Sequence, residues 1–381
     1  MTEVAVSSPP VISTPKRLLG WAAFAAAALL CCELGARLDD WFFEDVPFFE
    51  NPSYDNMFTF DEHGLRRGKP GARWKRVALN NLGMRGADVP AHSAEGCQRW
   101  MFLGASETFG EPSMADAEYP ARVRALARQR SRCVDVLNTA YPGIAPQGLL
   151  SYYNAALRAY APDVVFVYAS THFYLAEIGP RVQPAAEPPK PQPPVQSPAD
   201  DGSLASIIKK SRFLERLKDT AEVPAVIQEM RLRRWIDAET AGKPADWPFD
   251  RVPEDRLAVL DADLRELIAA IRASGAEPVL MTHAVRVTDP PRAEDHVDLY
   301  SMRRFVPRAS EAILAAFEYQ AADSVRKLGV EMHVRVIDVA RLLDGRRDQF
   351  IDLVHFTEAG HEDVAQLIVR EMGATDPHAV H

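Results

Sequence analysis

A serine between two glycines and a distant aspartate–histidine pair are the residues of this chain whose types and spacing could do chemistry. Ser106 lies in residues 104–110, whose glycines permit a tight turn that would hold the hydroxyl at the edge of a sheet. Asp352 precedes His355 by three residues, so its carboxylate can accept a hydrogen bond from one ring nitrogen while the other takes the serine proton. Together these residues predict nucleophilic catalysis, although each segment alone also suits a turn or a helix cap.

Short apolar segments bounded by turn residues would position these groups. They alternate with stretches whose apolar residues recur about every 3.6 positions, which is typical of amphipathic helices. Such alternation predicts a parallel sheet covered by helices on both faces. The predicted strands are residues 100–103, 134–137, 164–168, 278–281 and 334–337. The predicted helices are residues 119–129, 148–159, 255–273, 310–328 and 358–372.

The residues that follow each predicted strand are candidate site residues, because ligands of open parallel sheets bind beyond the carboxyl ends of the strands. Gly143 follows the second strand in a Pro-Gly turn, and its backbone amide could approach a substrate. Thr171 and His172 follow the third strand, and Thr282 and His283 follow the fourth. Substrate contact and a plain strand-end role are both open for the residues after the fourth strand.

These segments resemble the sequence blocks of the SGNH (GDSL-like) hydrolases. Residues 104–110 look like the first block, Gly143 like the glycine of the second, and residues 352–355 like the terminal D-x-x-H, in the family's order. The resemblance spans about residues 100–372. It implies a flavodoxin-like three-layer α/β sandwich with a five-stranded parallel sheet, and ester chemistry.

The resemblance also implies roles for individual residues. Ser106 would be the nucleophile, His355 the general base and Asp352 the residue that orients the base. The backbone amides of Ser106 and Gly143 would stabilise the oxyanion.

Two departures from the family pattern affect the same site. Ala105 stands where the first block normally has Asp, which removes a hydrogen bond that usually fixes the serine loop. Residues 169–174 replace the G-x-N-D of the third block, whose asparagine is an oxyanion donor. His172 falls at or next to the position of that asparagine and could donate an N–H in its place.

An apolar segment near the N-terminus predicts a membrane anchor. Lys16 and Arg17 precede the apolar residues 18–32, and a helix that continues to Leu38 reaches about the 20 residues needed to cross the hydrocarbon core. A cleaved signal peptide is the alternative, but the segment lacks a small-x-small cleavage site. Basic residues before the segment and acidic residues after it predict a single-pass inner-membrane protein, with a cytoplasmic N-terminus and a periplasmic or extracellular main domain.

The predicted organisation follows from these features. A cytoplasmic tail (1–16) and the anchor (17–38) precede an irregular lead-in (39–97), then an SGNH-type domain (98–374) with an inserted Pro-rich loop and helices at about 180–250. Cys97 and Cys133 each stand just before a predicted strand. An oxidising compartment would let them pair, and two buried free thiols are the alternative.

Composition excludes several classes of partner and cofactor. The formal net charge is −9, and no basic run is interleaved with aromatic residues, so we expect no nucleic-acid partner. Cysteine and histidine are scattered without ligand spacing, so no metal site is predicted. No phosphate-binding glycine motif follows a predicted strand, and no cofactor is expected.

The sequence therefore predicts an anchored, extracytoplasmic enzyme that adds or removes an acyl group, acetyl above all, on a carbohydrate of the cell envelope. Small esters and lipids remain open as substrates. The alternative is a degenerate SGNH fold that binds or scaffolds within an envelope complex, and Ala105 with the altered third block favours it. Covalent labelling by a fluorophosphonate distinguishes the two, because it requires an activated serine.

Overall fold

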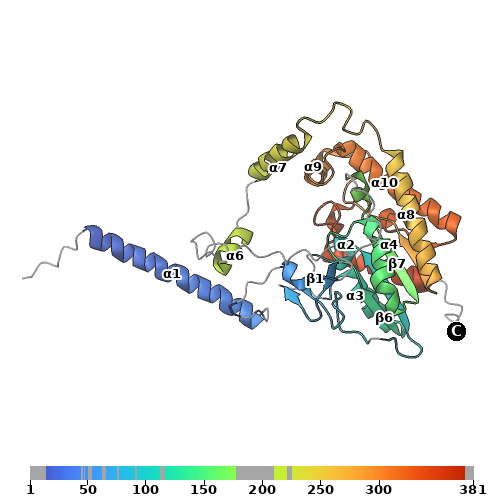
Figure 1. Cartoon of the computed structure of the whole chain (residues 1–381), viewed down its shortest axis with the longest axis horizontal. Helices are drawn as coiled ribbons and strands as arrows, with labels where there is room; N and C mark the ends of the chain where they lie inside the picture. Colours follow the sequence, from blue (N-terminus) through green and yellow to red (C-terminus); the bar gives the residue numbers. More distant parts are fainter. Residues whose placement is uncertain are drawn as a thin grey trace, which may run out of the picture. The chain divides into compact units, whose positions relative to one another are not determined.

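The computed structural model describes residues 14–43, 46, 48–49, 54–61, 66–74, 77–90, 92–111, 116–176, 210–220 and 225–373 (Figure 1). The chain divides into two compact units. The smaller consists of residues 1–53 and 193–223, and the larger of residues 54–192 and 224–381. The predicted Pro-rich loop at 184–198 lies outside the described residues.

A five-stranded parallel sheet with the order β6-β5-β7-β8-β9 forms the centre of the larger unit. Its strands are β5 (Gln98–Gly104), β6 (Val134–Asn138), β7 (Val164–Tyr168), β8 (Glu277–Met281) and β9 (Arg335–Ile337). Each strand begins and ends within two residues of a predicted segment. The predicted parallel sheet is thus confirmed.

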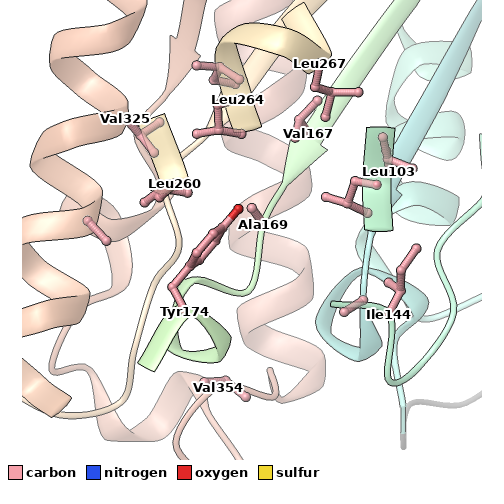
Figure 2. Close-up of a cluster of buried hydrophobic side chains, with 14 of the residues drawn as sticks. Leu103, Ile144, Val167, Ala169, Tyr174, Leu260, Leu264, Leu267, Val325 and Val354 are labelled. Atoms are coloured by element: carbon pink, nitrogen blue, oxygen red, sulfur yellow. The ribbon is translucent and has the colours of Figure 1, made fainter. Parts of the chain in front are cut away.

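Helices cover both faces of this sheet, which makes the unit a three-layer sandwich. Met101 and Leu103 of β5 belong to the core on one face, and Trp100 and Phe102 belong to the core on the other, because successive side chains of a strand point to opposite faces. The first core is packed by α8 (Glu254–Ala273) and α10 (Glu311–Met332), and Figure 2 shows part of it. The second is packed by α3 (Tyr119–Gln129), α11 (Val339–Leu343) and α12 (Glu358–Gly373).

Among its described residues, the larger unit also contains the helices α2 (Ser106–Phe109), α4 (Leu149–Tyr152), α7 (Ala225–Thr240) and α9 (His296–Met302). The predicted helix at 148–159 is irregular in the structure. After α4 the chain makes a π-turn at Tyr153–Leu157 and a 3-10 turn at Arg158–Tyr160. The π-turn keeps both Tyr153 and Leu157 fully buried in the core.

The lead-in to the sheet is more ordered than predicted. It contains two antiparallel pairs, β1 (Phe58–Phe60) with β2 (Arg66–Gly68) and β3 (Arg73–Trp74) with β4 (Val77–Ala78). Strands of two or three residues are too short to show a period in the sequence, which is why they were missed. Phe58 packs against Phe109 of α2, with 6.4 Å between ring centroids, so the lead-in supports the helix that begins at Ser106.

The smaller unit contains α1 (Thr14–Phe43) and α6 (Arg212–Thr220). Within α1, residues Leu18–Phe43 are long and apolar enough to cross a membrane, judged by length and composition. The side chains of Leu18, Leu19 and Trp21 are among the most exposed apolar groups of the described chain.

Acidic residues of α1 hold α6 within this unit. The Glu33 carboxylate accepts hydrogen bonds from Ser211 Oγ and from the backbone N–H groups of Arg212 and Phe213, so it caps the N-terminus of α6. Asp40 is buried and accepts hydrogen bonds from Arg212 and Arg216. The charged residues near the end of the apolar helix therefore have partners.

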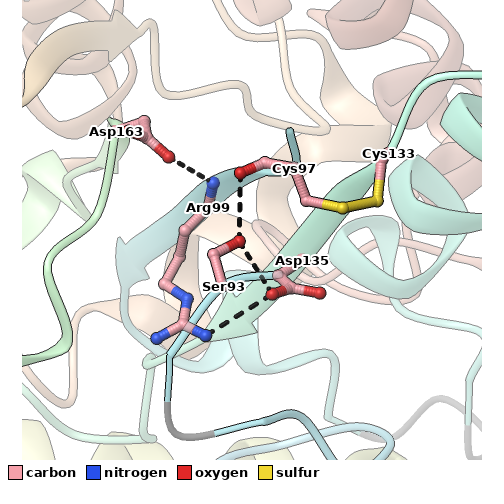
Figure 3. Close-up of a disulfide and its surroundings, with 6 residues drawn as sticks. All are labelled: Ser93, Cys97, Arg99, Cys133, Asp135 and Asp163. Atoms are coloured by element: carbon pink, nitrogen blue, oxygen red, sulfur yellow. Dashed lines mark hydrogen bonds and ion pairs between the residues drawn. A yellow bond between two sulfur atoms is a disulfide. The ribbon is translucent and has the colours of Figure 1, made fainter. Parts of the chain in front are cut away.

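A disulfide joins Cys97 and Cys133 at the start of β5 and β6 (Figure 3). The Cα atoms are 4.6 Å apart, and Gln98 N–H donates to the Cys133 carbonyl oxygen. Asp163 accepts from the backbone N–H of Arg99 at 2.6 Å beside it. The disulfide therefore lies at the amino ends of β5 and β6. The candidate site residues follow the carboxyl ends of the strands, at the opposite edge of the sheet.

Candidate active site

The turn after β5 presents Ser106 as the first residue of the short helix α2. A side chain at Gly104 would place a Cβ 2.2 Å from Thr108 Oγ1 and 2.9 Å from the carbonyl oxygen of Tyr168, so the turn requires glycine there. Asn138 Nδ2 donates to the Thr108 carbonyl oxygen at 2.9 Å. These close contacts fix the turn against the neighbouring strands.

The start of α2 also supplies free backbone donors. The first N–H groups of a helix have no acceptor within the helix and carry partial positive charge. Ser106 and Glu107 occupy the first two helical positions. The amide of Ser106 is therefore suited to stabilise negative charge that develops on a substrate bound beside its hydroxyl.

A small closed turn carries Asp352 and His355. It is clamped by an antiparallel bridge between Phe350 and Phe356, both buried, and by a 2.8 Å hydrogen bond from Ile351 N–H to the His355 carbonyl oxygen. Asp352 Oδ1 accepts from the backbone N–H of His355 at 2.9 Å. The carboxylate and the imidazole are thus oriented by the backbone of their own turn.

The structure brings the three predicted residues into one hydrogen-bonded line. His355 Nε2 lies 2.9 Å from Ser106 Oγ, and His355 Nδ1 lies 2.8 Å from Asp352 Oδ2. Because an ionised carboxylate can only accept, Nδ1 carries a proton and Nε2 of the neutral ring is left to accept from the serine. The side chain of His355 is 26% exposed, so solvent can reach this line.

The charges around His355 set its protonation. Burial favours the neutral imidazole, but the hydrogen bond to Asp352 and the negative charge of Glu107 outweigh it and raise the pKa of His355 above its ordinary value. Burial opposes ionisation of Asp352 as well, yet the hydrogen bond from His355 lowers the pKa of this carboxyl to about 2. Asp352 therefore stays ionised and supports the imidazolium that forms when the serine loses its proton.

A second group of histidine and carboxylate side chains lies directly beneath the serine turn. Glu107 Oε1 is 3.2 Å from His283 Nε2, and His283 Nδ1 is 2.8 Å from Glu318 Oε2. Glu318 Oε1 is 3.4 Å from His172 Nδ1. We call Glu107, His172, His283 and Glu318 the buried cluster, because each is at most 2% exposed.

Hydroxyl groups complete the buried cluster. Ser170 Oγ donates to Glu107 at 2.8 Å, and Thr171 Oγ1 donates to Glu318. Glu107 Oε2 is also 3.4 Å from Ser106 Oγ, which links the cluster to the serine. The consecutive residues Ser106 and Glu107 of α2 therefore belong to different groups of side chains: Ser106 bonds to His355, and Glu107 bonds to the buried cluster.

The carboxylates of the buried cluster are held ionised by its histidines. Burial would raise the pKa of Glu107, but the hydrogen bond and charge of His283 lower it to about 2. The charge of His283 likewise lowers the pKa of Glu318, although burial of this carboxyl opposes the shift. Burial alone would lower the pKa of His283, but the two carboxylates raise it to about 10.

Three predicted substrate contacts are corrected by the structure. Thr171, Thr282 and His283 are each at most 1% exposed, so in this conformation a substrate does not reach them. Thr282 Oγ1 donates to Asp338 at 2.9 Å and accepts from Ala340 N–H, which makes it a strand-end contact within the fold. Thr171 and His283 instead bond to Glu318.

Two other predicted residues lie where the sequence placed them. Gly143 is exposed in the turn after β6, with φ of 82°, a left-handed conformation that favours glycine. His172 is the second residue of the 3-10 turn Thr171–Leu175 that follows β7. Its role as an oxyanion donor stays a prediction, as does that of the Gly143 amide.

Glu107 and Glu318 were missed by the sequence reasoning, although both left a signal. Glu107 stands in the serine segment itself, among residues that are otherwise small or apolar. Glu318 lies on the face of α10 that also carries Leu314, Phe317 and Ala321, all fully buried. A carboxylate on the apolar face of a helix needs a buried partner, which would have pointed to a polar group inside the core.

No family model matches this sequence, and no curated protein is similar to it in sequence. The comparison of folds does find similar structures. One is assigned to the G-D-S-L lipolytic family and comes from Desulfitobacterium hafniense DCB-2, with 10% identity over 72% of this chain and 99% of that chain, and a TM-score of 0.39.

Two further similar structures are enzymes by description. An acetylxylan esterase from Geobacillus stearothermophilus is 14% identical over 75% of this chain and 97% of its own, with a TM-score of 0.42. A lipase/acylhydrolase from Enterococcus faecalis is 14% identical over 72% of this chain and 95% of its own, with a TM-score of 0.41. At these identities the likeness concerns the fold and not the reaction.

Proposed function

We propose that this chain is an SGNH-type serine ester hydrolase or O-acyltransferase. The observation that carries the proposal is the hydrogen-bonded line from Ser106 Oγ through His355 to Asp352. It has the order and tautomer that activation of a serine demands, and it stands at the carboxyl edge of the sheet, where ligands of this fold class bind.

The reaction would proceed through an acyl-enzyme. Ser106 Oγ attacks the acyl carbon of the ester as its proton passes to His355 Nε2, and the imidazolium is stabilised by Asp352. The tetrahedral intermediate then expels the alcohol, which takes the proton from His355. Water or a hydroxyl group of an acceptor next attacks the acyl-enzyme, gives its proton to His355, and releases the acid or a new ester as Ser106 recovers the proton.

The oxyanion of the tetrahedral intermediate needs donors that are already in place. The backbone amide of Ser106 at the start of α2 is one, and the amide of Gly143 is the other that we propose. His172 is 2% exposed, so we assign it to the buried cluster and not to the oxyanion. Removal of a single oxyanion donor typically lowers turnover about 10²- to 10³-fold.

Location and substrate belong to the proposal as well. The apolar helix Leu18–Phe43 would anchor the chain in the inner membrane with the larger unit outside the cytoplasm, and the Cys97–Cys133 disulfide suits an oxidising compartment. We propose an acyl ester of envelope carbohydrate, acetyl above all, as the substrate, because an anchored enzyme meets such polymers at the membrane.

Ester turnover by the full chain in detergent, with p-nitrophenyl acetate as substrate, tests the proposal. We expect turnover by the wild-type chain and its loss in Ser106→Ala. Ser324→Ala is the matched control, since this hydroxyl on α10 bonds to the Gln320 carbonyl oxygen of its own helix and belongs neither to the triad nor to the buried cluster.

Labelling with a fluorophosphonate gives a second reading that does not depend on the choice of ester. The reagent should phosphonylate the wild-type chain and the Ser324→Ala variant but not Ser106→Ala. A wild-type chain that neither turns over the ester nor takes the label would contradict the enzyme proposal and favour a binding or scaffold role.

A further inference from the structure

The buried cluster has the side chains of a metal site. Glu107, His172 and His283 each offer one ligand atom, and no two of these atoms are more than 4.8 Å apart. The three residues come from α2, from the turn after β7 and from the segment after β8. The parallel sheet therefore brings together residues that are far apart in the sequence. Two imidazole nitrogens and one carboxylate oxygen form a donor set that zinc and related divalent metals accept.

The spacing of the donors fits coordination. Zinc bonds to histidine nitrogen and carboxylate oxygen measure about 2.0–2.2 Å, so neighbouring donors of a tetrahedral site lie about 3.3–3.6 Å apart. His283 Nε2 and Glu107 Oε1 are 3.2 Å apart, close to that spacing. One ring nitrogen of His172 lies within 4.8 Å of the ligand atoms of the other two residues, so a small inward movement of this ring would complete the spacing.

Glu318 lies where a carboxylate can orient both histidines. Metal-binding histidines almost always donate the N–H of the second ring nitrogen to a carboxylate or carbonyl, which fixes the tautomer. Glu318 Oε2 is 2.8 Å from His283 Nδ1, and Glu318 Oε1 is 3.4 Å from His172 Nδ1. A single carboxylate can therefore take both Nδ1–H groups and leave Nε2 of each ring for a metal.

One contact of the cluster lacks good hydrogen-bond geometry. His172 Nδ1 and Glu318 Oε1 are both buried, and among the residues that the structure describes neither atom has a hydrogen-bond partner of good geometry. Buried polar atoms normally find partners, so such a pair indicates a group that is missing or a small movement on binding. Drawing His172 toward a metal would reorient the ring that carries this nitrogen.

The charges of the cluster also favour a cation. Glu107 and Glu318 bring two negative charges into the interior, where uncompensated charge is costly. A divalent cation with both histidines neutral balances the two carboxylates fully.

We infer that the buried cluster binds one divalent transition-metal ion of the zinc class. Glu107 and the Nε2 atoms of His172 and His283 are the protein ligands, and Glu318 orients the two histidines. Because Glu107 follows Ser106 directly in α2, the ion would also fix the serine turn, a function that Ala105 cannot supply.

Metal binding by the full chain in detergent tests this inference without any measurement of ester turnover. The chain is stripped with a chelator and titrated with Co²⁺, whose visible absorption reports tetrahedral coordination, and bound Zn²⁺ is counted by elemental analysis. We expect one equivalent per chain. His172→Gln and Glu107→Gln should lose it, and Glu318→Gln should bind about 10- to 100-fold more weakly.

Matched variants locate the ion. His296→Gln removes an exposed histidine that pairs with Glu311, and Asp352→Asn alters the other histidine–carboxylate pair near the serine, so both should keep one equivalent. Ser106→Ala should also bind as the wild type does, which separates this inference from the proposed reaction. Loss of metal in Asp352→Asn with retention in His172→Gln would overturn the assignment.

The wild-type chain alone keeps the inference testable if a variant fails to fold. An ion that binds the native state and not the unfolded state raises the melting temperature. We expect such a rise when Zn²⁺ is added to the stripped chain. An unchanged melting temperature together with no cobalt absorption would show that the cluster is an ion-pair network without a metal.

Discussion

Two arrangements of histidine and carboxylate meet at a single turn, and they differ in their access to water. Ser106 joins His355 and Asp352, whose side chains are 26% and 54% exposed. Its neighbour Glu107 joins His283 and Glu318, whose side chains are 0% and 1% exposed. Each arrangement pairs a histidine with a carboxylate.

This difference in exposure separates a histidine that water and substrate can reach from one that they cannot reach. A partly exposed histidine can gain and lose a proton within each turnover, with water and substrate at hand. The imidazole of His283 stands between two buried carboxylates, so loss of its proton would leave their charge uncompensated. Residue types alone therefore do not distinguish a catalytic pair from a buried one.

The largest expected effect falls on the exposed pair. Asp352→Asn should lower kcat for p-nitrophenyl acetate about 10⁴-fold, because the amide favours the wrong tautomer of His355 while the geometry persists. Asp348→Asn, on the same segment but with a side chain 73% exposed and outside the triad, is the control. Equal activity of Asp352→Asn and wild type would remove Asp352 from the proposed mechanism.

A smaller effect, on stability, is expected within the buried cluster. Removal of one partner from a buried ion pair costs about 3–5 kcal/mol, whereas an exposed pair contributes about 0–1 kcal/mol. Glu318→Gln should therefore lower the free energy of unfolding far more than Glu311→Gln. Both residues lie on α10 and pair with a histidine, but the Glu311–His296 pair is exposed.

Chemical unfolding of the full chain, in detergent with a chelator present, measures this contrast. The midpoint should fall clearly for Glu318→Gln and little for Glu311→Gln. Similar losses in the two variants would show that burial does not distinguish these pairs and that the charges assigned to the cluster are wrong.

The smallest expected effect is a shift in pH dependence. His355 acts as a base only when neutral, and its pKa is raised above the ordinary value of 6.5. Ester turnover should therefore be low below that pKa and rise with pH through it, to a plateau on the alkaline side. In Asp352→Asn the midpoint of the pH profile of the residual activity should move to lower pH, because the carboxylate that stabilises the imidazolium and raises the pKa of His355 is gone. A wild-type midpoint below 6.5 would contradict this account.

The fold could be predicted from the sequence because its signals are local. Residues 164–168 form an uninterrupted run of apolar and β-branched side chains, and they are the residues of β7 in the structure. The helix predicted at 119–129 coincides with α3 for the same reason. By contrast, the pairs β1–β2 and β3–β4 depend on contacts with the rest of the fold.

The candidate site could be predicted only in part. The serine segment and the aspartate–histidine segment carry their own turn chemistry, and the structure joins them at 2.9 Å. The buried cluster gathers side chains from positions 107, 172, 283 and 318, which share no motif spacing. Only the register of the parallel strands and the packing of α10 place them together, so sequence patterns alone do not place Thr171 and His283 in the interior.

The capping of α6 by Glu33 bears on how the larger unit could be released from the proposed membrane anchor. The chain passes through the smaller unit twice, first with α1 and again with residues 193–223. A protease that cuts between α1 and Tyr54 leaves α6 bound to α1 through Glu33 and Asp40. With α1 as the proposed anchor, we therefore expect the larger unit to be retained after this cut. Release requires separation of the two helices or two further cuts, one on each side of α6, because α6 is joined to the larger unit at both of its ends.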